Sequence, residues 1–266
     1  MTTPPVSADK GEKPSAHVTP PSYWPIALAT AVGFLACGLL IQLWAGPWGS
    51  GLLVFSGLGT VICLMGWANR MIGDMGHIPD VTHEDHGLRM GVLLFLASET
   101  AVFGALFAHH YYARFHAAQW PPQGAPKLET HLPAIATLIL MFSSATMQWA
   151  HAALLQGKRR AASWLVLLTI ALGVVFLGFQ GYDWGFLKVY DKFTQTSGTF
   201  GTTFYSMTGF HGLHVTVGLI FLMLVWIRLR LGHFDPQRHF SFVAASWYWH
   251  FVDVVWIFLF FTIYLF

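Results

Sequence analysis

The chain has 266 residues, of which 55% are apolar and only 10% are charged. A soluble domain usually carries about 25% charged residues. This deficit and a mean hydropathy of +0.54 exclude an ordinary soluble globular protein and indicate a membrane protein. The formal net charge of +2 gives no reason to expect a nucleic-acid partner.

The predicted helices follow a polar N-terminal segment. Residues 1–22 are rich in Pro, Thr and Ser and lack the apolar region of a signal peptide, so we expect a disordered tail. Seven apolar stretches follow, each long enough to cross a bilayer, which takes about 20 residues. These stretches are residues 24–45, 49–70, 88–112, 132–156, 162–182, 202–229 and 243–266.

The lengths of the connections divide these spans into two groups. The first two spans, within residues 23–70, are joined by only a few residues, and small residues such as Gly33 and Gly38 would let them pack closely. A polar connection over residues 71–87 separates them from the other five spans, within residues 88–266. The sequence therefore predicts an all-α polytopic membrane protein, built from a two-helix and a five-helix bundle.

The distribution of Lys and Arg predicts the orientation. With the N-terminus in the cytoplasm, ten of these residues lie on the inner side and four on the outer side, as the positive-inside rule requires. Lys158, Arg159 and Arg160 share a tight inner loop, where the rule is most reliable. We expect a multi-pass protein of the bacterial inner membrane, with its C-terminus in the periplasm.

Glu99 is the most informative ionisable residue. It lies 11 residues beyond Leu88, which places it about 16 Å along its helix and near the middle of the bilayer. An ionised carboxylate there costs at least about 3 kcal/mol. Glu99 should therefore be neutral, paired or facing a polar cavity, and it could handle protons, contact lipid or form a hydrogen bond to another helix, for example to His211.

Two further polar pairs lie within predicted spans. His211 and His214 on the sixth span, and His250 and Asp253 on the seventh, are each three residues apart and so share a helix face. Two His facing each other across helices could bind haem. A di-iron site would need Glu-x-x-His repeats, and none occurs in the sequence. We favour a buried polar network of these four residues and Glu99 that joins helices, and we expect no metal ligands in this chain.

Two segments resemble signature stretches of a known family. The segment from Thr208 to Val215 reads TGFHGLHV, and that from Trp247 to Trp256 reads WYWHFVDVVW. Both resemble cytochrome c oxidase subunit III, as do the segment GLRMG at residues 87–91, which leads to Ser98-Glu99, and WPP at residues 120–122. The resemblance runs from about residue 23 to the C-terminus.

This resemblance implies an accessory subunit without a cofactor or catalytic residues of its own. Haem and copper would belong to partner subunits of a proton-translocating terminal oxidase that takes electrons from cytochrome c. The chain would pack directly on subunit I, with subunit II in the same complex. In the family it stabilises the catalytic subunit and supports proton uptake, and a cleft between its two helix bundles holds phospholipids.

The resemblance also implies a set of lipid contacts. Positions that match or lie near the family's contacts are Trp67, Arg70, His77, Glu99, Arg228, Arg238 and His239. One departure is Val243, which stands where the family usually has an acidic residue. A function of that carboxylate in collecting protons could not operate in this chain.

Three alternatives remain. The same subunit type occurs in quinol oxidases, but these relatives often have five helices, and the two additional N-terminal spans favour the cytochrome c type. A proton channel or transporter could use Glu99 as its relay, although the sequence shows neither broken helices nor an inverted repeat. A membrane cytochrome could bind haem through the intramembrane His residues.

Overall fold

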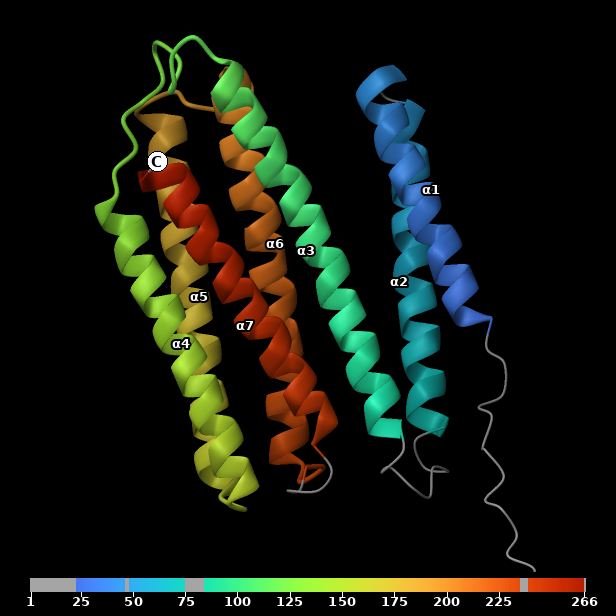
Figure 1. Ribbon diagram of the computed structural model, residues 1–266. Helices are drawn as coiled ribbons and strands as arrows, with labels where there is room; N and C mark the ends of the chain where they lie inside the picture. Colours follow the sequence, from blue (N-terminus) through green and yellow to red (C-terminus); the bar gives the residue numbers. More distant parts are fainter. Residues whose placement is uncertain (1–22, 46–47, 75–83, 235–238, 266) are drawn as a thin grey trace, which may run out of the picture. The chain divides into compact units, whose positions relative to one another are not determined.

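The computed structural model describes residues 23–45, 48–74, 84–234 and 239–265, and within these residues it contains seven α-helices and no strand (Figure 1). This confirms the all-α prediction. The chain ends in one π-helical turn, η2, which follows α7 directly. The helices are α1 Trp24–Ala45, α2 Trp48–Asp74, α3 Glu84–His116, α4 His131–Leu155, α5 Arg159–Val189, α6 Gly198–Arg230 and α7 Phe240–Phe260, with η2 at Phe261–Leu265.

The described helices have the lengths that membrane spans need. Six of them, α2 to α7, contain sufficiently long and apolar stretches, whereas the stretch found in α1, Trp24–Gly38, is apolar but shorter. The 22 residues of α1 would extend about 33 Å, enough for a hydrocarbon core of about 30 Å. α5 begins three residues before the predicted span 162–182 and ends seven residues after it, because hydropathy marks the bilayer and not the end of the helix.

The chain forms two compact units, Met1–Pro79 and Asp80–Phe266. In the first unit, α1 packs against α2. Gly38 allows this contact, since a Cβ there would lie only 3.1 Å from the backbone nitrogen of Leu53, whereas Gly33 faces open space. Of the predicted segments outside these helices, residues 1–22 and 75–83 are not among the described residues.

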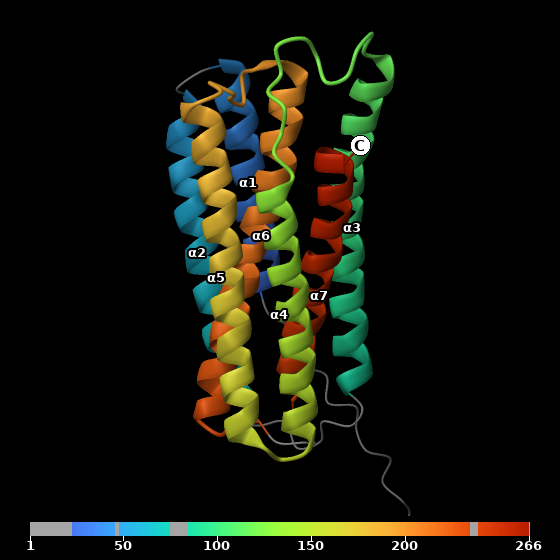
Figure 2. The same ribbon diagram turned by 90° about the vertical axis from the view of Figure 1, so that its left-hand side faces the viewer.

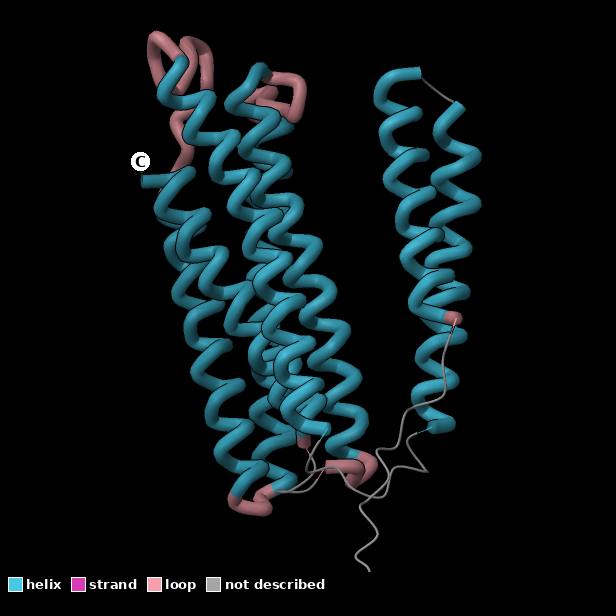
Figure 3. The backbone as a smooth tube through the Cα atoms, turned by 45° about the vertical axis from the view of Figure 1, so that its right-hand side comes forward, coloured by secondary structure: helices cyan, strands magenta, loops and turns pink. Residues whose placement is uncertain are grey.

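In the second unit, four helices form a closed ring. α4 packs on α5 and α7, and α6 packs on the same two helices, while α3 lies outside the ring against α6 and α7 (Figure 2). The described loops of this unit lie at its two ends (Figure 3). Neighbouring helix ends are therefore brought together at each end of the unit.

Trp249 of α7 is the central contact of the ring. It is fully buried, and its indole N–H donates a hydrogen bond of 2.9 Å to Ser143 Oγ on α4. The ring occupies space left by two glycines, because a Cβ on Gly173 of α5 or Gly218 of α6 would lie 2.6 Å or 3.0 Å from its carbon atoms. One side chain thus fixes the spacing of four helices.

Trp256 repeats this arrangement two turns further along α7. Its indole N–H donates to Thr137 Oγ of α4 at 2.9 Å. Its ring centroid lies 4.8 Å from that of Phe176 on α5 and 5.0 Å from that of His211 on α6. The two tryptophans therefore join α7 to the same three helices at two levels.

This packing predicts that Gly173→Ala lowers the thermal midpoint of the purified protein. The added Cβ would overlap the Trp249 ring and a methyl group of Leu219, at a cost of about 1–3 kcal/mol. Gly178→Ala is the matched control in α5, because that position faces open space and alanine is the better helix former. Equal midpoints for the two variants would contradict the packing of Trp249 described here.

Candidate functional site

Glu99 of α3 pairs with His214 of α6. Glu99 Oε2 lies 3.0 Å from His214 Nε2, and the two side chains are 21% and 9% exposed. His214 Nδ1 lies 2.8 Å from the carbonyl oxygen of Phe210. Since a carbonyl only accepts hydrogen bonds, Nδ1 carries a proton. One more proton then lies between Nε2 and Oε2, giving either a neutral pair or an ion pair, and the net charge is zero in both.

Aromatic residues enclose this pair. The ring of Phe103 lies 5.0 Å from that of His214 in an edge contact, and the Tyr248 hydroxyl of α7 donates to the carbonyl oxygen of His214 at 3.3 Å. The pair and its surroundings therefore connect α3, α6 and α7. A largely buried site of this kind can hold one proton and tie three helices together.

The predicted pairing of Glu99 with His211 is wrong. His211 is fully buried, and its ring lies between Phe176 of α5 and Trp256 of α7. Residues three apart on a helix differ by about 60° in direction. α6 has α3 on one side and the ring helices on the other, so this angle is enough to direct the two His side chains to different neighbours.

His250 and Asp253 of α7 share one partner on α4. The hydroxyl oxygen of Ser144 lies 2.8 Å from His250 Nδ1, and the same hydroxyl donates to Asp253 Oδ2. Because the hydroxyl proton goes to the carboxyl group, the oxygen accepts from Nδ1–H. The shared helix face was predicted, but Ser144 was not, since a serine in an apolar stretch gives no indication of its partner.

Three histidines within the spans, His211, His214 and His250, point to different neighbours. His214 faces α3, His250 faces α4, and His211 is enclosed by rings from α5 and α7. Two imidazoles that hold a haem must face each other across it. Over the part of the chain that is described, no group of three or more His, Cys, Asp or Glu side chains is arranged to hold a metal ion.

Several other polar contacts join helices and were not predicted. Each links two elements through a hydroxyl group, and none has a sequence spacing that identifies it. They are Thr146 with Thr169 at 2.8 Å, Trp184 with Thr208 at 3.2 Å, Tyr264 with Asp183 at 3.0 Å and Tyr111 with Thr262 at 3.0 Å.

The residues predicted to bind lipid occupy separate places. Arg228 donates to Ser241 Oγ at 2.9 Å, and its guanidinium lies 4.8 Å from the centroid of the Phe234 ring. His239 directly precedes α7, and its ring centroid is 5.4 Å from that of His151. The side chains of Trp67 and Arg70, and all of His77 and Arg238, lie outside the described residues.

The sequence matches one family over almost its whole length. The sequence model described as Cytochrome c oxidase subunit III matches residues 14–266. The chain belongs to the cytochrome c oxidase subunit III family. Cytochrome c oxidase subunit 3 of Marchantia polymorpha is 39% identical over 95% of this chain and 97% of that protein. The corresponding proteins of Arabidopsis thaliana and Scyliorhinus canicula are 37% and 39% identical, over 96% and 93% of this chain and 97% and 95% of their own lengths.

Family membership confirms the recognition made from the two motifs. The segment from Thr208 to Val215 supplies His214, and the segment from Trp247 to Trp256 supplies both ring tryptophans and the partners of Ser144. In this subunit III chain the recognisable residues are thus those that hold the five-helix unit together.

We expect Glu99→Ala to lower the thermal midpoint of the purified protein, because it leaves the buried Nε2 of His214 without its partner. The loss should be about 1–3 kcal/mol. Glu99→Gln should lose less, since its amide can still donate to the imidazole. Ser98→Ala is the neighbouring control, as Ser98 bonds only within α3. A midpoint for Glu99→Ala equal to that of Ser98→Ala would contradict a structural bond.

Ser144→Ala should also destabilise the protein, because it removes the common partner of His250 and Asp253 inside the bundle. A cost of about 1–3 kcal/mol is expected, measured as a lower midpoint in thermal unfolding. The control is Thr216→Ala, which removes an exposed hydroxyl that bonds within α6. Similar midpoints for the two variants would mean that the Ser144 contact adds no stability.

Proposed function

We propose that this chain is the accessory, cofactor-free subunit of a respiratory cytochrome c oxidase. It packs directly on catalytic subunit I, in a complex that also contains subunit II. The partner subunits hold the haem and copper, and the complex receives its electrons from cytochrome c. Membership of the subunit III family over almost the whole chain is the observation that carries this proposal.

The use of the buried polar groups supports a role without catalysis in this chain. A redox centre needs ligands that converge on one point. Here His214 is hydrogen-bonded to Glu99, and His250 is hydrogen-bonded to Ser144. His211 is packed between aromatic rings. These contacts stabilise the helix bundle, which would in turn support the catalytic subunit.

The exterior of the bundle supports contact with apolar surroundings. Leu138, Ile220 and Phe258 are each more than half exposed on the helices α4, α6 and α7. Such side chains are suited to lipid tails and to helices of a partner. Stabilising subunit I and retaining phospholipids would both use surfaces of this kind.

Glu99 and His214 support a contribution to proton uptake. Their hydrogen bond holds one proton whose position can change between the two side chains without changing the net charge. A site of this kind near the middle of α3 would help maintain proton uptake by the catalytic subunit. In a channel or transporter the same pair would be the relay, but the family assignment favours the oxidase.

The distribution of basic residues supports the proposed orientation. Lys158, Arg159, Arg228 and Arg230 lie at the end of the second unit where α5 begins and α6 ends. This end would face the cytoplasm by the positive-inside rule. The named relatives come from plants and a fish, so the bacterial inner membrane stays a prediction from the sequence.

Co-purification tests the proposal most directly. An affinity-tagged chain, extracted in mild detergent, should bring down a larger subunit with a haem absorption band, and the complex should oxidise reduced cytochrome c. The separated chain should show no Soret band. Oxidation of quinol but not of cytochrome c would favour the quinol-oxidase alternative.

Two results would contradict the proposal. One is recovery of the chain as a stable protein without partner subunits and with transport activity of its own. The other is a Soret band that stays with the separated chain and disappears in the His214→Ala or His250→Ala variant.

A further inference from the structure

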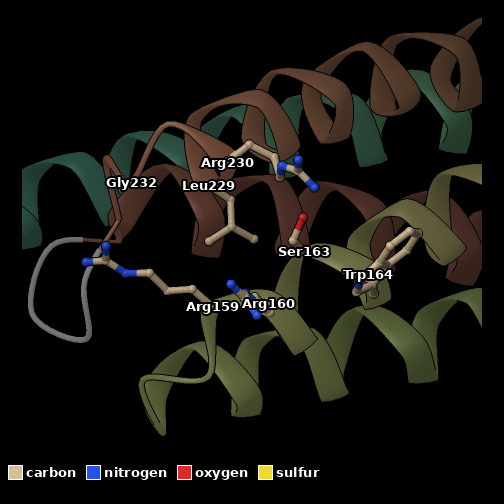
Figure 4. A pocket seen from close by; sticks show the side chains of 7 residues that line it. All are labelled: Arg159, Arg160, Ser163, Trp164, Leu229, Arg230 and Gly232. Carbon is tan, nitrogen blue, oxygen red and sulfur yellow. The ribbon is translucent and has the colours of Figure 1, made fainter.

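A basic pocket lies at the end of the second unit where α5 begins and α6 ends (Figure 4). Its volume is about 530 Å³, within the range of about 300–1,000 Å³ that small-molecule sites have. The lining residues are Arg159, Arg160, Ser163 and Trp164 of α5, and Leu229, Arg230 and Gly232 at the end of α6.

The walls of this pocket carry positive charge that they do not neutralise. Three arginines line it, and none of its lining residues in the described part of the chain is acidic. Among the described residues, none of the three forms an ion pair, and Arg230 instead lies 5.8 Å from the ring centroid of Trp226. The first turn of α5 has no acidic residue, and the residue before it makes no side-chain capping bond. The positive end of the helix dipole therefore adds to the field of the arginines.

The pocket changes from charged to apolar along α5. Arg159 is the first residue of the helix, and Ser163 lies one turn, or about 6 Å, further along the axis. Trp164 follows and is 68% exposed at the side of the helix. Leu229 of α6 forms part of the opposite wall (Figure 4). This order matches a molecule with an anionic group at one end and an apolar body at the other.

We propose that this pocket binds the phosphate group of an anionic glycerophospholipid. Arg159, Arg160 and Arg230, which line the pocket, attract the phosphate, because arginine matches phosphate geometry and keeps its charge. The glycerol region lies near Ser163, and the acyl chains pass along the exposed Trp164. Tryptophan is enriched at this depth of a bilayer, and basic pockets between membrane helices recognise lipid head groups.

This site is separate from the lipid contacts predicted from the sequence, which include Arg228. Arg228 is two residues from Arg230 on α6, but its guanidinium is held by Ser241 and Phe234. The inference rests on the charges and shape of the second unit alone. It therefore does not depend on assembly with oxidase subunits.

Native mass spectrometry of the full-length protein, with whichever subunits co-purify, tests the inference. The protein is delipidated and titrated with dioleoyl phosphatidylglycerol, and separately with inorganic phosphate. We compare the wild type with a variant that combines Arg159→Gln, Arg160→Gln and Arg230→Gln. The control combines Lys127→Gln and Lys192→Gln, two exposed positions in loops at the other end of the unit.

The wild type and the control should bind one phosphatidylglycerol that the triple variant binds about a hundredfold more weakly, at about fivefold for each charge removed. Inorganic phosphate should not displace this lipid. Equal binding by the triple variant would overturn the inference. Displacement of the lipid by inorganic phosphate would also overturn it, because it would indicate a site for a soluble anion. Loss of a co-purifying subunit in the triple variant, in place of loss of the lipid, would overturn it too and would indicate a protein interface. Thermal midpoints of both variants verify that folding is retained.

Discussion

Packing of the five-helix unit depends on Trp249, which requires a hydrogen-bond acceptor on one neighbouring helix and small residues on two others. In a bilayer, lipid tails are as apolar as the helix surfaces, so close packing and hydrogen bonds decide which helices associate. The indole of Trp249 needs an acceptor on α4, which Ser143 provides. Its ring needs positions without side chains on α5 and α6, which Gly173 and Gly218 provide. A larger residue at either glycine would separate α7 from the other helices of the ring.

α3 depends on a different kind of contact. Only 6% of its span is buried, compared with 39% to 61% for α4 to α7, so little packing holds it. Two of its polar links join Glu99 to His214 of α6, and Tyr111 to Thr262 of η2. An unpaired polar group costs several kcal/mol in hydrocarbon, so links of this kind hold α3 in a defined register. The hydrogen bond of Glu99 therefore stabilises the structure both as a neutral pair and as an ion pair with His214.

The sequence predicts the helices better than it predicts their contacts. Hydropathy locates every described helix, with ends within seven residues of those observed, because a bilayer imposes a minimum length on each apolar stretch. Partners are a different problem. His211 and His214 are equally plausible partners for Glu99 by spacing, and only the position of α3 relative to α6 selects His214. Ser144 is one of several hydroxyl residues in α4, and its contact with His250 depends on packing between residues more than 100 positions apart.

The arginines near the end of α6 show that lipid binding, like helix contacts, depends on side-chain directions that the sequence does not predict. Arg228 and Arg230 belong to one basic set in the sequence, but residues two apart on a helix differ by about 160° in direction. Arg228 turns to Ser241 and Phe234, where its charge is used within the protein. Arg230 turns to the start of α5, where it joins Arg159 and Arg160 around an open pocket. A count of basic residues predicts which end faces the cytoplasm, whereas the direction of each side chain determines which of them are available to an anionic lipid.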